Sequence, residues 1–226
     1  MAERFPGILG QVRYGSRLGA LLLLAMLFAA PLSSAQTLNI SEVGERFSGL
    51  ADDTFFPREV QVSGKNGTIR LKALGSGTRK QLMFKVYESA PYAQVGASLS
   101  PDPARAMYEG SFAKLMILRF LRDTDSAKVR DAINKGFERA LSDSELKDMK
   151  SERDQLMSFF SGGIKAGQSI ELAYIPGEGL HSRMSGRANP VIRGDAFANA
   201  VMKIWFGSRP VDEGLKRDML RLAKEF

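Results

Sequence analysis

The chain has 226 residues, of which 44% are hydrophobic, and a formal net charge of +7 at pH 7. This composition is typical of a globular protein, and the length favours a single domain. Cysteine is absent and His181 is the one histidine, which excludes thiol chemistry and a zinc site built on several histidines. The basic residues are spread along the chain without dense clusters, which argues against nucleic-acid binding.

The N-terminal residues have the pattern of an export signal. Three arginines precede an apolar segment, residues 18–30, and small residues follow it up to Ala35. The apolar segment is shorter than a membrane span requires, and its flanks are typical of a cleaved signal peptide. We therefore expect residues 1–35 to be a signal peptide and residues 36–226 to be one periplasmic or secreted domain without a membrane span. The alternative is an uncleaved signal anchor.

The first half of the domain is predicted to consist mainly of strands. A mixed polar stretch, residues 36–53, is expected to form a loop or a short strand. The sequence Gly-Lys-Asn-Gly at 64–67 is typical of the turn of a hairpin. Alternation of apolar and polar residues indicates half-buried strands on either side of a Ser/Pro-rich loop at 96–106. Strands are predicted over residues 59–62, 68–74, 82–87 and 114–121.

The second half is predicted to begin with helices. Residues 126–141 carry apolar residues at a four-residue spacing, which is typical of one face of a helix. Ser142 and Glu145 form a possible capping box for a second helix that ends at Gly162.

A hairpin and two more helices are expected to follow. Strands are predicted over 169–175 and 181–185, with His181 exposed. A helix over 196–206 is expected to pack Phe197, Val201 and Trp205 against the sheet, and a last helix begins at Pro210. Strands and helices grouped in this way indicate an α+β protein.

Residues 74–92 carry the pattern that we interpret as a ligand site. A small-residue turn, 75–77, is followed by Arg79 and then by an apolar strand that contains Tyr87. A guanidinium offers a fork of donors that matches a carboxylate, and a phenol adds a hydroxyl on an apolar ring. The pattern therefore favours an apolar ligand with one oxyanion, although such residues on strands are also common at the surface and in packing.

Four ordered stretches of the sequence resemble the chalcone isomerase-like family, in its bacterial, exported branch. The stretch at 194–220 is the most specific, because it contains Ile-Trp-x-Gly-x-x-Pro-Val followed by a helix rich in leucine and lysine. The other three are residues 74–92, 110–123 and 165–179. The resemblance implies an open-faced β-sandwich, in which helices cover a large antiparallel sheet and the ligand cleft lies between them.

The resemblance also implies roles for particular residues. Plant isomerases of the family close a chalcone into a flavanone, and related plastid proteins hold a fatty-acid carboxylate with an arginine and a tyrosine. Arg79 and Tyr87 match that pair, and Lys114 matches a family lysine. The catalytic tyrosine of the true isomerases has no counterpart after residues 114–121, which favours binding over isomerisation, and the sequence does not identify a catalytic residue.

The spacing of the two matched residues sets a condition on the site. Arg79 and Tyr87 are eight residues apart, which is about 26 Å in one straight strand. They can share one carboxylate only if the chain turns sharply within residues 79–81.

The sequence thus favours an exported protein that binds a small apolar anion such as a fatty acid, through Arg79, Tyr87 and Lys114. No metal or cofactor is expected. Two alternatives remain: an intramolecular lyase or isomerase that acts on a chalcone-like enone, and a non-catalytic interaction protein of the cell envelope.

Overall fold

The computed structural model describes residues 38–50 and 54–226, so the predicted signal peptide and its cleavage site lie outside the described residues. The described part of the chain forms nine strands, six α-helices and a short 3₁₀-helix, Ala223–Glu225. The strands are β1 (Ile40–Ser48), β2 (Phe55–Gly64), β3 (Gly67–Ala73), β4 (Gly77–Gln81), β5 (Phe84–Gln94), β6 (Lys114–Phe120), β7 (Ser169–Ile175), β8 (Gly179–Met184) and β9 (Arg187–Ala188). The helices are α1 (Pro103–Glu109), α2 (Ser126–Ala140), α3 (Asp143–Asp148), α4 (Lys150–Ser158), α5 (Asp195–Phe206) and α6 (Glu213–Met219).

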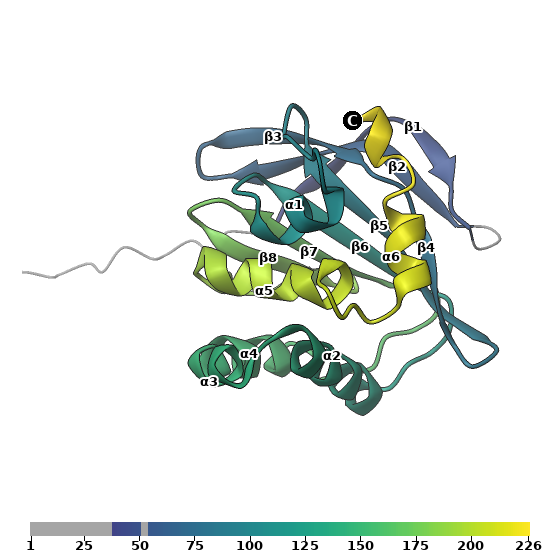
Figure 1. Ribbon diagram of the computed structural model, residues 1–226. Helices are drawn as coiled ribbons and strands as arrows, with labels where there is room; N and C mark the ends of the chain where they lie inside the picture. The colour runs from purple at the N-terminus through teal and green to yellow at the C-terminus, as the bar shows by residue number, and fades with distance from the viewer. Residues whose placement is uncertain (1–37, 51–53) are drawn as a thin grey trace, which may run out of the picture. The chain divides into compact units, whose positions relative to one another are not determined.

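The nine strands form one antiparallel sheet (Figure 1). The strand order is β1-β2-β3-β5-β6-β7-β8-β9, and β4 pairs with β5 beside this path. The long strand β5 therefore has two partners on one edge, β3 along its C-terminal part and β4 along its N-terminal part. The predicted class, an α+β fold with a large antiparallel sheet covered by helices, is confirmed.

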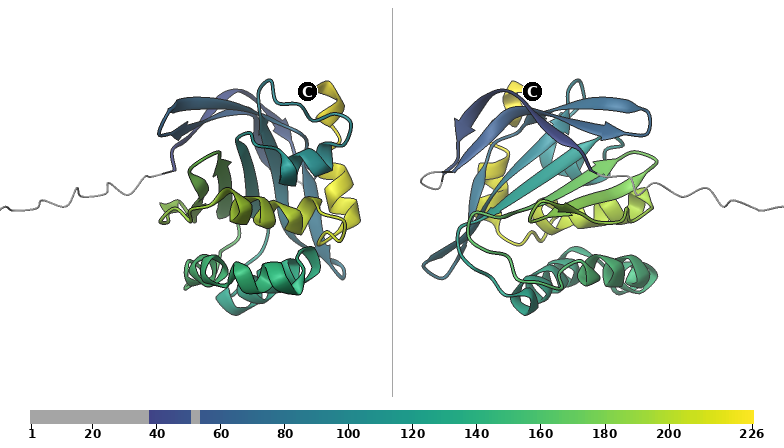
Figure 2. Two further views of the ribbon diagram at one scale, coloured as in Figure 1. Left: turned by 60° about the vertical axis from the view of Figure 1, so that its left-hand side comes forward. Right: turned by 180° about the vertical axis from the view of Figure 1, so that it is seen from behind.

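The helices gather on one side of the central strands (Figures 1 and 2). Helix α5 lies against β7 and β8 and contacts both α1 and α2, while α6 packs on β4. The apolar side of α5 is buried as predicted, with Phe197, Val201 and Trp205 all at most 5% exposed. Burial of this face is the main reason for the helix to dock on the sheet.

The central strand β6 divides the apolar residues into two cores. Met116, Leu118 and Phe120 point into the core beneath the helices. Leu115 and Ile117 point to the opposite face, where they meet residues of β1, β2 and β3. Successive side chains of a strand point to opposite faces, so a strand that is buried on both faces serves both cores. The back view in Figure 2 shows the first strands curling over this second face.

Several boundaries differ from the sequence predictions. The expected loop at 96–106 contains the start of helix α1, which Asp102 caps through its side chain. The expected helix from Ser142 to Gly162 is two helices that meet at Met149, although the predicted capping box is present. The last helix begins after Asp212, whose carboxylate caps it, and not at Pro210.

The expectation that His181 is exposed was wrong. This residue lies on β8 opposite Ala173 of the second core, is 2% exposed and contacts Glu178, with 3.1 Å between Nε2 and Oε2. Burial lowers the pKa of the imidazole against the opposing effect of Glu178. The polar, glycine-rich sequence around His181 did not indicate a buried strand, and the side chain shares the face of Ala173, on the side of the sheet opposite the helices.

In the described part of the chain, no helix combines the length and the apolar character that crossing a bilayer requires.

Candidate ligand-binding site

A tight hairpin brings the predicted site residues Arg79 and Tyr87 together. Strands β4 and β5 are joined by the two-residue turn Leu82–Met83, and Arg79 lies directly opposite Tyr87 in the antiparallel ladder. Residues that pair in this way point to the same face of a sheet. The condition set by their spacing is therefore met, but the turn lies at Leu82–Met83 and not within 79–81. The predicted strand over 82–87 was wrong at its start.

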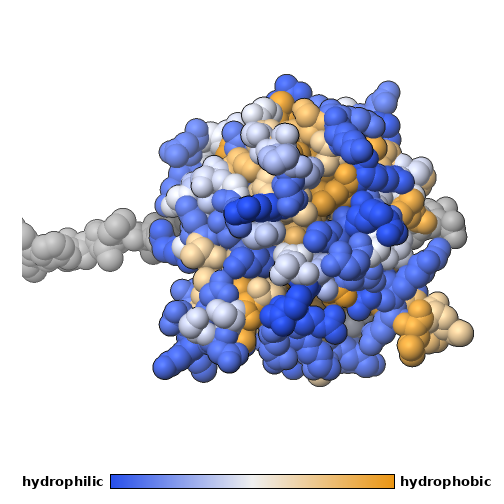
Figure 3. Space-filling model, viewed as in Figure 1, coloured by the Kyte–Doolittle hydropathy of each residue, from blue (hydrophilic) through white to orange (hydrophobic). Residues whose placement is uncertain are grey.

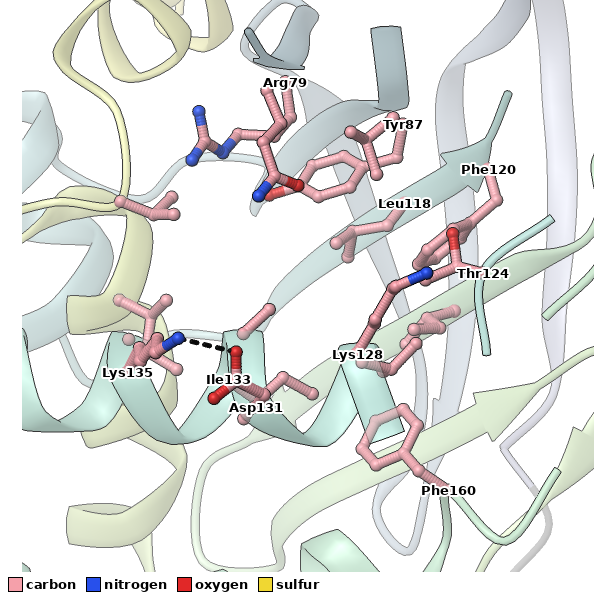
Figure 4. Close-up of a pocket in the computed structure, with 18 of the residues that line it drawn as sticks. Arg79, Tyr87, Leu118, Phe120, Thr124, Lys128, Asp131, Ile133, Lys135 and Phe160 are labelled. Carbon is pink, nitrogen blue, oxygen red and sulfur yellow. Dashed lines mark hydrogen bonds and ion pairs between the residues drawn. The ribbon is translucent and has the colours of Figure 1, made fainter. Parts of the chain in front are cut away.

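A cavity of about 630 Å³ lies beneath this hairpin, between the sheet and helices α2, α4 and α5 (Figure 4). This volume is within the range of about 300–1,000 Å³ that small-molecule sites occupy. Side chains of the sheet form one wall and side chains of the three helices form the other. The apolar lining includes Phe84, Leu118, Phe120, Val129, Ile133, Leu156, Phe160, Ile170, Leu172, Val201, Ile204, Trp205 and Val211.

Arg79 lies at the edge of this cavity with its side chain 25% exposed. Its Nη1 atom donates to Asp212 Oδ2 at 2.9 Å and to the carbonyl oxygen of Lys80 at 2.5 Å. No described residue accepts a hydrogen bond from Nε or Nη2. Part of the guanidinium fork thus remains able to donate to a ligand oxyanion.

Tyr87 lies beside Arg79 and presents a neutral phenol. Trp205 Nε1 on α5 donates to the Tyr87 hydroxyl oxygen at 3.1 Å, and the Tyr87 ring packs on Phe120 with centroids 5.8 Å apart. Burial raises the pKa of Tyr87 to about 12, while the Trp205 hydrogen bond and the charge of Arg79 oppose that rise. Among the described residues no acceptor takes the phenol proton, so it can be donated to a ligand.

The rim of the cavity is predominantly basic. Five basic side chains and two acidic ones line it, and helix α2 contributes most of them. Lys135 and Asp131 on α2 pair at 2.8 Å (Figure 4). The five basic residues are Arg79, Arg122, Lys128, Lys135 and Arg139. Such an excess of positive charge favours an anionic ligand.

Lys114, the third predicted site residue, does not line this cavity. It lies at the opposite end of β6 from Phe120 and is fully buried. Its Nζ atom donates to Asn199 Oδ1 at 3.0 Å and lies 5.0 Å from the ring centroid of Tyr174. Burial lowers the pKa of Lys114 to about 8. The structure therefore groups Arg79 with Tyr87 and leaves Lys114 apart from them; a ligand contact by Lys114 stays a prediction.

Trp205 and Asp212 are site residues that the sequence did not indicate. Trp205 sits on an apolar helix face, which predicts a core residue whether or not a cavity adjoins it. Asp212 follows the Pro-Val element, and its side chain both caps α6 through Leu215 N and pairs with Arg79. Only the tertiary arrangement of α5 and α6 over the hairpin shows that these two residues belong to the site.

The protein is thus of the α+β class, with helices covering an antiparallel sheet and a cavity of ligand size between them. A model of the chalcone isomerase-like family matches residues 51–221, and the chain belongs to that family. A crystal structure of an Arabidopsis thaliana fatty-acid binding protein is similar in fold, with a TM-score of 0.61 and 20% sequence identity. The similarity covers 78% of this chain and 96% of the plant chain. A comparison with curated proteins found no match.

Proposed function

We propose that this protein binds a small apolar molecule with one carboxylate, such as a fatty acid, in the cavity beneath the β4–β5 hairpin. The observation that carries the proposal is the position of Arg79 and the neutral Tyr87 on the wall of a largely apolar cavity. The fold that the chain shares with a plant fatty-acid binding protein supports the same choice of ligand.

The proposed ligand lies with its carboxylate at the hairpin and its chain along the apolar wall. Arg79 Nε and Nη2 and the Tyr87 hydroxyl supply charge-assisted hydrogen bonds to the carboxylate. The acyl chain covers Leu118 and Phe120 on the sheet and Ile133 on α2. Removal of apolar surface from water contributes about 25 cal/mol per Å².

Asp212 is the native partner of Arg79, so the ligand must share the guanidinium with it. The pair is partly exposed, with side chains 25% and 28% accessible. An ion pair with such access to solvent contributes about 1 kcal/mol or less. Because Asp212 takes its hydrogen bond from Nη1 alone, a ligand carboxylate can bind Nε and Nη2 beside Asp212 without displacing it.

A titration of a fluorescent long-chain fatty acid tests the proposal. We expect Arg79→Ala to weaken binding by about 10- to 150-fold, because a charged hydrogen bond contributes about 1.5–3 kcal/mol. Arg79→Lys should recover only part of this loss, because lysine lacks the fork. Tyr87→Phe should cost about 1 kcal/mol, the value of one neutral hydrogen bond.

Two controls separate this function from its alternatives. A fluorescent alcohol with the same chain length should bind equally to wild type and Arg79→Ala, because it carries no charge for Arg79 to hold. Circular dichroism must show that each variant is folded. Equal fatty-acid binding by all variants would contradict the assignment of the site, and turnover of a chalcone without fatty-acid binding would favour the isomerase alternative.

We further propose, from the sequence pattern of residues 1–35, that the protein is exported and that its mature form begins at Gln36. N-terminal sequencing of protein from the periplasmic fraction checks this directly. Recovery of the intact N-terminus from that fraction would count against cleavage.

A further inference from the structure

The tip of the β4–β5 hairpin exposes large apolar side chains. Leu82 is 92% exposed, Met83 is 86% exposed and Phe84 is 52% exposed. These are the three highest values among the large hydrophobic residues that the structure describes. Figure 3 shows apolar atoms projecting from the lower right of the molecule, where Figure 1 places the end of this hairpin. Adjacent side chains with such exposure favour contact with another apolar phase.

Neither the turn nor the core explains an apolar residue at the tip. Leu82 has φ 55° and is the first residue of a two-residue hairpin loop. Glycine, asparagine or aspartate suits such a position, and leucine is strained there. Because Leu82 is almost fully exposed, its side chain also gains no burial within the fold.

Basic side chains surround the apolar tip. The hairpin sequence from Lys80 to Lys85 contains no acidic residue, and both lysines are exposed. The Arg122 guanidinium, also exposed, stacks on the Phe84 ring at 4.5 Å from the centroid. An apolar point with cations behind it matches the boundary between the acyl chains and the anionic headgroups of a bilayer.

We propose that this hairpin tip docks on an anionic phospholipid bilayer by inserting Leu82 and Met83 below the headgroups. Lys80, Lys85 and Arg122 then lie at the level of the lipid phosphates. A protein partner fits the feature less well, because stable protein interfaces cover about 800 Å² on each side and a two-residue tip supplies only a small part of that.

The tip is continuous with the candidate ligand cavity. Gln81, Leu82 and Phe84 belong to the lining of that cavity as well as to the hairpin. A docked hairpin therefore places the cavity entrance against the bilayer, where an apolar anion can pass between lipid and protein without crossing water. This exchange rests on the proposed function, whereas docking itself does not require a ligand.

Sedimentation with phosphatidylcholine vesicles that contain phosphatidylglycerol tests docking directly, with the ligand absent. The informative variant replaces Leu82 by Gly and Met83 by Asn, because Leu82 is the loop residue with a positive φ and glycine is favoured at that first position of a two-residue hairpin loop. We expect this variant to bind the vesicles about 10- to 100-fold more weakly, since two apolar side chains no longer leave water. Lys80→Gln should weaken binding by about 5-fold, and only when the lipids are anionic.

Val95→Asn is the matched control, because Val95 is 46% exposed just beyond the other end of β5. It should bind the vesicles like wild type. Failure of wild type to sediment with anionic vesicles would overturn docking, and so would equal binding by the variant with Leu82→Gly and Met83→Asn. If the protein binds fatty acid in solution but does not bind vesicles, docking is wrong and the proposed function is retained. If it binds vesicles but not fatty acid, docking is retained and the proposed function is wrong.

Discussion

Similar residues lie at or beside the two ends of strand β6, in different surroundings. At one end, Arg79 pairs across the ladder with Tyr87, which accepts a hydrogen bond from Trp205 on α5. At the other end, Lys114 pairs across the ladder with Tyr174, and its Nζ atom donates to another residue of α5. Each end thus combines a cation, a tyrosine and a polar group from one helix.

The candidate cavity adjoins the Arg79 end and is not lined by Lys114. The cavity lies beneath Arg79 and Tyr87, whereas Lys114 is fully buried between aromatic rings. A buried cation without a full counter-charge is costly, which is why the pKa of Lys114 falls to about 8. We infer from this comparison that a cation and a tyrosine on neighbouring strands are not enough to propose a ligand site, and that an adjoining cavity is also needed.

The largest expected effect on stability comes from Trp205, which lies on α5 and lines the cavity. Trp205→Ala should lower the free energy of unfolding by about 3–5 kcal/mol, because a buried aromatic ring is removed and a cavity is left. Trp205→Phe should cost much less, since it keeps most of the apolar burial. Urea unfolding followed by circular dichroism measures both. A near-neutral Trp205→Ala would mean that α5 is not anchored at this end.

The buried Lys114, at the other end of β6, predicts a dependence of stability on pH. The pKa of Lys114 is about 8 in the folded protein against an ordinary 10.5, so the unfolded chain binds more protons between these values. The free energy of unfolding should therefore rise by about 2 kcal/mol between pH 8 and 9.5 on account of this residue. Lys114→Met should remove that part of the rise. Identical pH profiles for the two proteins would contradict the lowered pKa.

The smallest expected effect is on ligand affinity, and it distinguishes the two roles of Asp212, which caps α6 and pairs with Arg79. Asp212→Asn removes the charge beside Arg79 but keeps an oxygen that can cap α6 at Leu215 N. Fatty-acid affinity should rise by about 5-fold, because two carboxylates no longer compete for one guanidinium. Stability should change little. Weaker binding by this variant would show that Asp212 is needed to orient Arg79.

The sequence predicted the fold class and the apolar face of α5, because alternation and helical spacing record which side chains are buried. For Arg79 and Tyr87, the sequence set only the condition that the chain must turn sharply between them if they are to share one carboxylate. A turn at Leu82–Met83 has apolar residues in place of the usual turn residues, so the segment was interpreted as a strand. Lys114 was grouped with the site because it matches a family lysine, and sequence spacing does not report which end of β6 adjoins the cavity.

The fatty acid assignment is tested most directly by the fluorescence of Trp205, the only tryptophan in the chain and a residue of the cavity wall. A stearic acid brominated on its acyl chain quenches an indole only at close range. We predict saturable quenching at one ligand per protein, with much weaker quenching in Arg79→Ala. Ile133→Phe places a larger side chain in the cavity wall and narrows the cavity, so this variant should also reduce quenching. Absence of quenching in wild type, or equal quenching in all three proteins, would contradict binding in this cavity.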